Sequence, residues 1–330
     1  MEYAVEIDGL TKKYGSFTAV SQLSLKVARG SIHGFLGPNG AGKTTTIKVL
    51  VGLLKPNEGT VKVLGQEVHG KRDASFFAGF LQTFREQADF RLSIGYMPEL
   101  PKFPKHLKGA ELLDIYGRMY GMTEQQRREQ VPKLIELVGL KGRENELIGK
   151  YSKGMQQRIG IAQALLNNPE LVILDEPSLG LDPVGMVEVR ELIKTISKEG
   201  MTVFVSSHLL YEVEQICTNV TIINRGVVLV SDTLQNVSGM LTGPALIHAE
   251  VARMSNTVVQ ALKSLPFVTN VGQTGNALNI QVASHEDVRI QVSETITKAG
   301  GVIVGMSLKG SNLEDVFMQL VSKDQGGKTQ

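Results

Sequence analysis

A glycine-rich segment at residues 37–44 constrains this chain more than any other feature. It reads Gly-Pro-Asn-Gly-Ala-Gly-Lys-Thr and matches the pattern G-x-x-x-x-G-K-[ST] at every fixed position. Residues 31–36 predict a short buried strand before it, and residues 44–54 predict a helix after it. In this context backbone N–H groups bind phosphate oxygens, the Lys43 ammonium neutralises phosphate charge and the Thr44 hydroxyl binds Mg²⁺. A chance glycine turn is the alternative, which the flanking strand and helix disfavour.

Two carboxylates follow a second predicted strand. Residues 171–174 are all apolar and are followed directly by Asp175 and Glu176, a pattern typical of a buried parallel strand that ends in acidic residues. Nucleotide sites in open α/β sheets lie at the carboxyl ends of such strands. We therefore expect Asp175 to hold Mg²⁺, directly or through water, and Glu176 to lie near an attacking water. A solvated acidic turn is the alternative, which the phosphate-binding loop disfavours.

A third predicted strand ends in a histidine. Residues 202–207 are rich in β-branched and apolar residues, and His208 follows them. His208 would emerge at the same edge of the sheet as the two carboxylates. Because an isolated histidine is more often structural than catalytic, the sequence by itself leaves both roles open.

Residues 151–158 precede the acidic strand and read Tyr-Ser-Lys-Gly-Met-Gln-Gln-Arg. This segment resembles the signature motif of ATP-binding cassette (ABC) ATPases, whose usual form begins Leu-Ser-Gly-Gly-Gln. The chain keeps Ser152 and Gly154 and differs at the other three positions, where it has Tyr151, Lys153 and Met155. An ordinary amphipathic helix capped by serine is the alternative, which the accompanying motifs disfavour.

The resemblance to ABC ATPases implies roles for further residues. Tyr14 matches the aromatic residue on which adenine stacks, and residues 180–183 match the loop that crosses the dimer interface. His208 matches the histidine that contacts the γ-phosphate, so the resemblance implies that Glu176, His208 and Lys43 are catalytic. The residues it implies for ATP binding are Tyr14, Gly37, Pro38, Asn39, Gly40, Ala41, Gly42, Lys43, Thr44, Thr45, Ser152 and Gly154.

Glu99 departs from the family pattern. Residues 94–99 occupy the place of the glutamine loop, and Glu99 stands where the family usually has glutamine. Both side chains offer an oxygen to Mg²⁺ or water, but the carboxylate adds a full negative charge. The implied metal ligands are Thr44, Asp175 and Glu99.

Composition excludes several classes of protein. The 330 residues include 35 Lys and Arg against 33 Asp and Glu, a net charge of +2, so no broad basic surface for nucleic acid is expected. The apolar runs are too short to span a bilayer, and the N-terminus has no apolar core of a signal peptide. We expect a soluble or peripheral protein. The single cysteine, Cys217, excludes an intrachain disulfide and agrees with a reducing compartment.

The patterns predict an α/β fold with two domains. Residues 1–236 are predicted to form a P-loop NTPase of the ABC cassette type, with a parallel core sheet, an antiparallel β subdomain and a helical subdomain at about 100–168. Residues 245–322 show a β-α-β-β-α-β order, which suggests a small ferredoxin-like α+β domain. Residues 323–330 are expected to form a disordered tail. The interval 70–93 is longer than usual in the family and contains Phe76, Phe77, Phe80 and Phe84. A local helix packed on the cassette is favoured over a partner-facing insertion.

The resemblance covers the whole chain and implies an ATPase subunit of an ABC exporter. Residues 313–317 are similar to the C-terminal segment of drug-export cassettes. The resemblance implies a separate transmembrane permease, a cytoplasmic location on the membrane face, and a second cassette, identical or homologous. Each ATP would lie between Lys43 of one chain and Ser152 with Gly154 of the other. A soluble ABC ATPase of translation or DNA repair is one alternative, which the absence of a second cassette or a long coiled coil disfavours. A P-loop kinase is a further alternative, disfavoured because the chain shows no acceptor-binding motif.

Overall fold

The computed structural model describes residues 2–68, 91–239, 245–283, 287–309 and 313–326. The chain forms two compact units, Met1–Leu234 and Gln235–Gln330, so the first unit ends two residues before the predicted boundary at 236. Most of the 70–93 interval, including Phe76, Phe77, Phe80 and Phe84, lies outside the described residues. Each unit has its own hydrophobic core.

The centre of the first unit is a six-stranded sheet in the order β10-β9-β3-β8-β7-β6. Strands β6, β7, β8, β3 and β9 run parallel, and β10 is antiparallel to β9. Strands β3, β7 and β8 are buried at every position, as their continuous apolar runs predict for a sheet covered on both faces. The strands are β3 (Ile32–Leu36), β6 (Ile94–Met97), β7 (Leu171–Asp175), β8 (Thr202–Ser207), β9 (Asn219–Asn224) and β10 (Val227–Thr233).

A second, antiparallel sheet has the order β2-β1-β4-β5. One face of it shares a hydrophobic core with helix α1 (Lys43–Leu50) and with the central sheet, through residues such as Leu25, Ile47 and Phe204. Alternating apolar and polar residues along these strands therefore place one face inside and the other at the surface. The strands are β1 (Tyr3–Tyr14), β2 (Phe17–Ala28), β4 (Glu58–Val63) and β5 (Gln66–Glu67).

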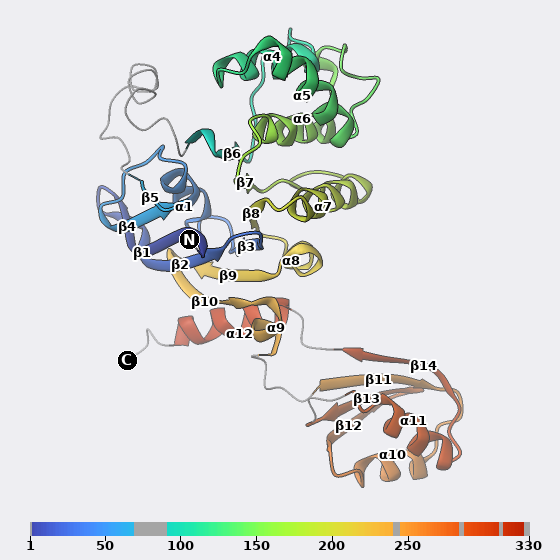
Figure 1. Cartoon of the computed structure of the whole chain (residues 1–330). Coiled ribbons are helices and arrows are strands. Elements are labelled where there is room, and N and C mark those ends of the chain that lie inside the picture. Colours follow the sequence, from blue (N-terminus) through green and yellow to red (C-terminus); the bar gives the residue numbers. More distant parts are fainter. Residues whose placement is uncertain (1, 69–90, 240–244, 284–286, 310–312, 327–330) are drawn as a thin grey trace. The chain divides into compact units, whose positions relative to one another are not determined.

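A group of helices completes the first unit and includes the predicted helical subdomain. Figure 1 shows α4, α5 and α6 gathered together beyond the edge strand β6. Among the described residues, no helix is long and apolar enough to cross a membrane. The helices are α4 (Gly109–Met119), α5 (Glu124–Leu137), the short 3-10 helix η1 (Ile148–Lys150), α6 (Lys153–Leu165), α7 (Pro183–Lys198) and α8 (Leu210–Ile216).

Helix α1 is shorter than the sequence predicted. It ends at Leu50 rather than residue 54, because Gly52 adopts a left-handed conformation with φ +70°. The N–H of Gly52 donates to the Val49 carbonyl and the N–H of Leu53 donates to the Lys48 carbonyl, a closure typical of helix C-termini.

The second unit has a four-stranded antiparallel sheet in the order β12-β13-β11-β14. Side chains of α10 and α11, including Val258 and Val292, share a core with Ile247 and Ile280 of the sheet. The β-α-β-β-α-β order and this pairing are the predicted ferredoxin-like arrangement. The last helix runs to Gly326, so the first four residues of the expected tail are helical. The elements are α9 (Leu234–Gly239), β11 (Ala245–Val251), α10 (Asn256–Lys263), β12 (Val268–Thr274), β13 (Ala277–Val282), α11 (Arg289–Lys298), β14 (Ile303–Lys309) and α12 (Leu313–Gly326).

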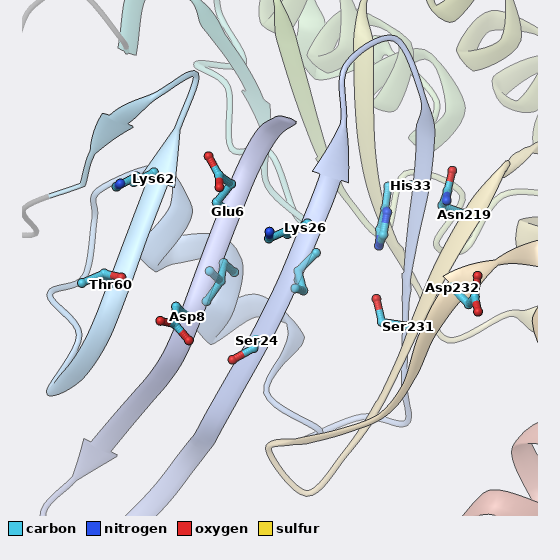
Figure 2. Close-up of a pocket in the computed structure, with 12 residues that line it drawn as sticks. Glu6, Asp8, Ser24, Lys26, His33, Thr60, Lys62, Asn219, Ser231 and Asp232 are labelled. Atoms are coloured by element: carbon cyan, nitrogen blue, oxygen red, sulfur yellow. The ribbon is translucent and has the colours of Figure 1, made fainter. Parts of the chain in front are cut away.

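A polar cleft of about 770 Å³ lies in the first unit, away from the phosphate-binding loop. Figure 2 shows side chains of β1, β2 and β4 on one side of it and His33 of β3 on the other. His33 is only 2% exposed and stacks on Phe204, with ring centroids 5.8 Å apart. Its Nε2 lies 2.9 Å from Thr221 Oγ1. Burial lowers the pKa of His33 to about 4. His33 is therefore a neutral side chain of the core at neutral pH. The charged residues along the cleft are Glu6, Asp8, Lys26, Lys62 and Asp232.

We expect His33 to make the fold sensitive to acid. In the unfolded chain His33 takes up a proton near pH 6.5, whereas in the fold its pKa is about 4, so the unfolded state binds more protons between these values and stability falls as pH decreases through that window. Between pH 7.5 and pH 5 this group should remove about 2 kcal/mol from the free energy of unfolding.

Urea unfolding at the two pH values, compared between the natural chain and His33→Gln, measures this contribution. The variant should lose that part of the pH dependence, whereas His106→Gln at an exposed position should keep it. The same pH dependence in His33→Gln and in the natural chain would contradict the neutral core assignment.

Candidate functional site

A second cleft, of about 500 Å³, collects most of the predicted site residues. They come from distant parts of the chain: the end of β1, the 37–44 loop, the segment after β6, and the ends of β7 and β8. Parallel strands bring these segments to one edge of the central sheet. The lining residues are Tyr14, Phe17, Ala19, Pro38, Asn39, Gly40, Ala41, Gly42, Lys43, Thr44, Thr45, Glu99, Glu176, Leu179 and His208.

The loop between β3 and α1 requires glycine at two tightly packed positions. Gly42 has φ +104°, and a Cβ there would lie 2.7 Å from the Ala19 carbonyl oxygen. A Cβ on Gly37 would lie 2.5 Å from the Ile223 carbonyl oxygen. Gly42 also forms the N-cap of α1, so the loop leads directly into a helix N-terminus, where free N–H groups and the helix dipole favour an anion.

Lys43 is buried at the first position of α1. Its Nζ donates a hydrogen bond of 2.7 Å to the Gly37 carbonyl and lies 3.1 Å from Glu176 Oε1. A weaker contact of 3.4 Å reaches the Pro38 carbonyl. The ammonium is therefore held across the loop by partners on both sides, close to where bound phosphate would need a cation.

Glu176 follows β7 in a strained conformation. Its φ is +51°, in the left-handed region that a glutamate seldom adopts. Its Oε2 accepts hydrogen bonds from the backbone N–H of His208 at 3.3 Å and lies 2.8 Å from His208 Nδ1. Lys43, Glu176 and His208 thus form one continuous polar network. His208 lies in the cleft, at the edge of the sheet where its place after β8 predicts it.

Asp175 is the last residue of β7 and is completely buried. Its Oδ1 accepts a 2.5 Å hydrogen bond from the Ser206 hydroxyl, and its Oδ2 has no hydrogen-bond partner among the residues that the structure describes. Burial raises the pKa of Asp175, the hydrogen bond from Ser206 opposes this rise, and the charge of Glu176 reinforces it. The nearby Thr44 hydroxyl also opposes the rise, although it makes no hydrogen bond to Oδ2. A buried carboxylate oxygen without a partner fits a hard cation such as Mg²⁺.

The protein would supply only part of a metal coordination shell. Within the described ranges, no group of three or more His, Cys, Asp or Glu residues could hold a metal ion. Mg²⁺ commonly binds through one or two carboxylates together with phosphate oxygens and water. Thr44, Asp175 and Glu99 are therefore compatible with Mg²⁺ only when phosphate completes the site.

Two exposed aromatic rings are among the residues that line the cleft. Tyr14 is 48% exposed and Phe17 is 63% exposed, and the two are cross-strand partners at the end of the β1–β2 hairpin. Exposed rings beside a phosphate-binding loop suit stacking of a nucleotide base. Phe17 was not among the predicted site residues, although a second aromatic residue shortly after Tyr14 is a signal that the sequence contains.

Ser152 and Gly154 lie outside this cleft. The Ser152 hydroxyl accepts a 3.2 Å hydrogen bond from the Met155 N–H and caps α6. Gly154 is the second residue of that helix, and a Cβ added to it would find only Leu181 Cδ2 at 3.7 Å and Ser152 Oγ at 3.9 Å. The two signature residues therefore lie at an uncrowded helix N-terminus that does not line this cleft of its own chain.

Similar proteins extend over nearly the whole chain. The model of the ABC transporter family matches residues 20–179. The bacitracin transport ATP-binding protein BcrA of Bacillus licheniformis is 34% identical over 322 residues, which cover 97% of this chain and 98% of BcrA. The linearmycin resistance ATP-binding protein LnrL of Bacillus subtilis is 32% identical, covering 97% and 98%. The daunorubicin resistance ATP-binding protein DrrA3 of Streptomyces coeruleorubidus is 30% identical, covering 98% and 97%.

Solved structures show the same cassette fold. An ATP-binding subunit of an ABC transporter matches with a TM-score of 0.60 at 29% identity, over 72% of this chain and 92% of that one. The cbiO1 protein of Clostridium perfringens, part of the ABC transporter complex cbiONQ, matches with a TM-score of 0.62 at 25% identity and the same coverage. The predicted α/β cassette is confirmed. The chain belongs to the ABC transporter family, among its ATP-binding ATPase proteins.

Proposed function

We propose that this chain is the ATP-hydrolysing subunit of an ABC exporter of the drug-resistance class and that it drives a separate transmembrane permease. The observation that carries this proposal is the polar network beside the phosphate-binding loop, in which the buried side chains of Lys43 and Glu176 continue to the partly exposed His208. The names of near full-length relatives, which concern bacitracin, linearmycin and daunorubicin, support the exporter class. They disfavour a soluble ABC ATPase without a permease.

The polar groups of the cleft suit in-line hydrolysis of a γ-phosphate. Glu176 would orient and polarise the attacking water, while Lys43 and His208 would stabilise the negative charge that develops on the phosphoryl oxygens. The stacked base would lie on Tyr14 and Phe17. The loop residues 37–45 would hold the phosphates through their backbone N–H groups.

A magnesium ion would be held by protein oxygens at the end of β7. The Thr44 hydroxyl and Asp175 Oδ2 are the proposed ligands, and Glu99, which lines the cleft, would contribute a further oxygen. When bound, Mg²⁺ neutralises phosphate charge and orients the transferred group.

A second cassette, identical or homologous, would complete each site. Ser152 and Gly154 do not line their own cleft, but the uncrowded N-terminus of α6 suits an anion supplied by another chain. ATP would then lie between Lys43 of one chain and Ser152 with Gly154 of the other, so that binding closes the pair.

The permease would contact the helical region beside Glu99. Leu100 is 59% exposed, and Ile115 and Met119, four residues apart on α4, are 41% and 50% exposed. Exposed apolar side chains of this kind suit a protein interface. On this proposal the chain lies at the cytoplasmic face of the membrane, attached through its permease, and does not bind nucleic acid.

Loss of the P-loop cation should weaken nucleotide binding. Lys43→Ala should raise the dissociation constant of ATP by at least about tenfold, equivalent to 1.4 kcal/mol, because no other ammonium lines the cleft among the residues described. Lys48→Ala, an exposed change on the same helix, is the matched control and should have little effect. Calorimetric titration measures both; equal affinities in the two folded variants would remove Lys43 from the phosphate site.

Neutralising Glu176 should separate binding from hydrolysis. Glu176→Gln keeps the side-chain size but removes the charge that polarises water, so turnover should fall by about a hundredfold or more. ATP affinity should persist or increase, because a phosphate would no longer compete with the Glu176 carboxylate for Lys43. Phosphate release assays and equilibrium titration test this, with Glu129→Gln on the exposed side of α5 as control. Near-normal turnover in Glu176→Gln would place the water-activating group elsewhere.

The signature residues should control association. In the Glu176→Gln background, saturating ATP should produce a dimer detectable by light scattering, and the added change Ser152→Arg should disperse it by crowding the partner's phosphate site. Gln125→Arg, which adds the same group at an exposed position of α5, should leave the dimer intact. A monomer at saturating ATP without Ser152→Arg would instead favour a homologous partner cassette.

A further inference from the structure

We infer that Ser206 is a positioning residue that couples the metal-binding carboxylate of Asp175 to the backbone of Glu176. Its hydroxyl donates to Asp175 Oδ1 at 2.5 Å and accepts from the Glu176 N–H at 3.0 Å. This inference rests on the proposed roles of Asp175 and Glu176. It assigns a function to a completely buried residue that does not line the cleft.

The direction of both hydrogen bonds follows from the donor inventory. The Glu176 N–H can only donate, so the Ser206 oxygen accepts from it. The single hydroxyl hydrogen is then available for Asp175 Oδ1. The Ser206 hydroxyl therefore bonds both the Asp175 carboxylate and the Glu176 N–H, on two consecutive residues, and both hydrogen bonds are buried.

The parallel register places Ser206 where it can do this. Asp175 of β7 lies opposite Ser206 of β8. The Ser206 carbonyl also accepts from the Glu176 N–H, at 3.2 Å, so backbone and side chain of the same serine share this donor. Ser206 is completely buried, and its hydroxyl consequently has fixed partners rather than solvent.

The Asp175 bond selects the oxygen that remains for a cation. With Oδ1 engaged by Ser206, Oδ2 is the atom without a hydrogen-bond partner in the described part of the chain. Mg²⁺ tolerates little deviation from octahedral geometry. A carboxylate fixed by a neighbouring hydroxyl would present one oxygen in one direction, as outer-shell partners of metal ligands commonly do.

The hydrogen bond from the Glu176 N–H to Ser206 stabilises the backbone turn that orients the glutamate side chain. Glu176 leaves β7 with φ +51°, and this turn directs its carboxylate toward Lys43 and His208. A left-handed glutamate persists only where surrounding contacts maintain it. Ser206 supplies two of those contacts, one from its hydroxyl and one from its carbonyl.

A matched residue on the same strand provides a control. Thr202 begins β8, is 2% exposed, and its hydroxyl accepts a 2.9 Å hydrogen bond from the Gly30 N–H. Thr202→Val removes a buried hydroxyl from β8 as Ser206→Ala does, but at the strand end away from the cleft. Comparing Thr202→Val with Ser206→Ala therefore distinguishes the general effect of losing a buried hydrogen bond from the specific effect of losing the contacts to Asp175 and Glu176.

The experiment uses the full chain and four variants: Ser206→Ala, Ser206→Cys, Ser206→Thr and Thr202→Val. For each, we would measure thermal unfolding, kcat and KM for ATP, the Mg²⁺ concentration at half-maximal turnover, and the affinity for a fluorescent ATP analogue with and without Mg²⁺. Ser206→Ala should lower kcat by about tenfold to a hundredfold and raise the Mg²⁺ midpoint. Its affinity for the analogue without Mg²⁺ should stay within about twofold of the natural chain, since Ser206 does not touch the loop.

The hydroxyl chemistry predicts a graded series. Ser206→Thr should restore most of the turnover and the Mg²⁺ midpoint, and Ser206→Cys, with a weak S–H donor, should fall between serine and alanine. Thr202→Val should lower thermal stability without moving the Mg²⁺ midpoint. In the Glu176→Gln background, Ser206→Ala should add little to the loss of turnover but should still weaken the Mg²⁺-dependent gain in analogue affinity.

Two outcomes would overturn different claims. If Ser206→Ala and Thr202→Val give the same kcat and the same Mg²⁺ midpoint, Ser206 is only a structural hydroxyl and the inference fails while the proposed function stands. If Glu176→Gln also retains turnover, the assignment of Glu176 itself fails. If Ser206→Ala does not fold, Ser206→Cys takes its place in the test. A Mg²⁺ midpoint of Ser206→Cys equal to that of the natural chain would then overturn the inference.

Discussion

The buried ion pair between Lys43 and Glu176 is the interaction on which the site depends. The two side chains are only 7% and 8% exposed, with Lys43 Nζ 3.1 Å from Glu176 Oε1. Burying two charges is unfavourable unless each gains further hydrogen bonds. Lys43 also donates to the Gly37 carbonyl, and Glu176 also contacts His208, so both charges have a second partner. Because β8 lies between β3 and β7, the pair joins the phosphate-binding loop to the acidic strand across a third strand.

The parallel register of the central sheet makes that pair possible. Leu36 lies opposite Ser207, and Ser206 lies opposite Asp175, so β3, β8 and β7 end at nearly the same level. The residues that follow them consequently emerge together at one edge. A shift of one residue in either pairing would turn each side chain to the other face of the sheet. These strands are buried at every position, so such a shift would also force closely packed side chains on both faces of the sheet to repack. The packing of the core therefore also holds the geometry of the candidate site.

The sequence predicted the parts of this site that depend on local pattern. The loop motif and the strand ends identified Lys43, Glu176 and His208, since each follows a recognisable apolar run. Ser206 could not be identified in this way, because within a β-rich run it is an ordinary polar residue until the register with β7 places it beside Asp175. The early end of α1 was missed for a similar reason. The left-handed glycine that ends it lies inside an apolar pattern that is otherwise helical.

The donor capacity of Lys43 links nucleotide binding to activation of the proposed base. An ammonium group has three donors, and in this structure it contacts the Gly37 carbonyl, the Pro38 carbonyl and Glu176. A phosphate oxygen can therefore accept a hydrogen bond from the Lys43 ammonium only by replacing one of these partners. Glu176 is the partner best able to give way, because His208 continues to bond its other oxygen. On the proposed function, the phosphate that takes Lys43 would thereby release Glu176 Oε1 toward water, so the base becomes available only when its substrate is bound.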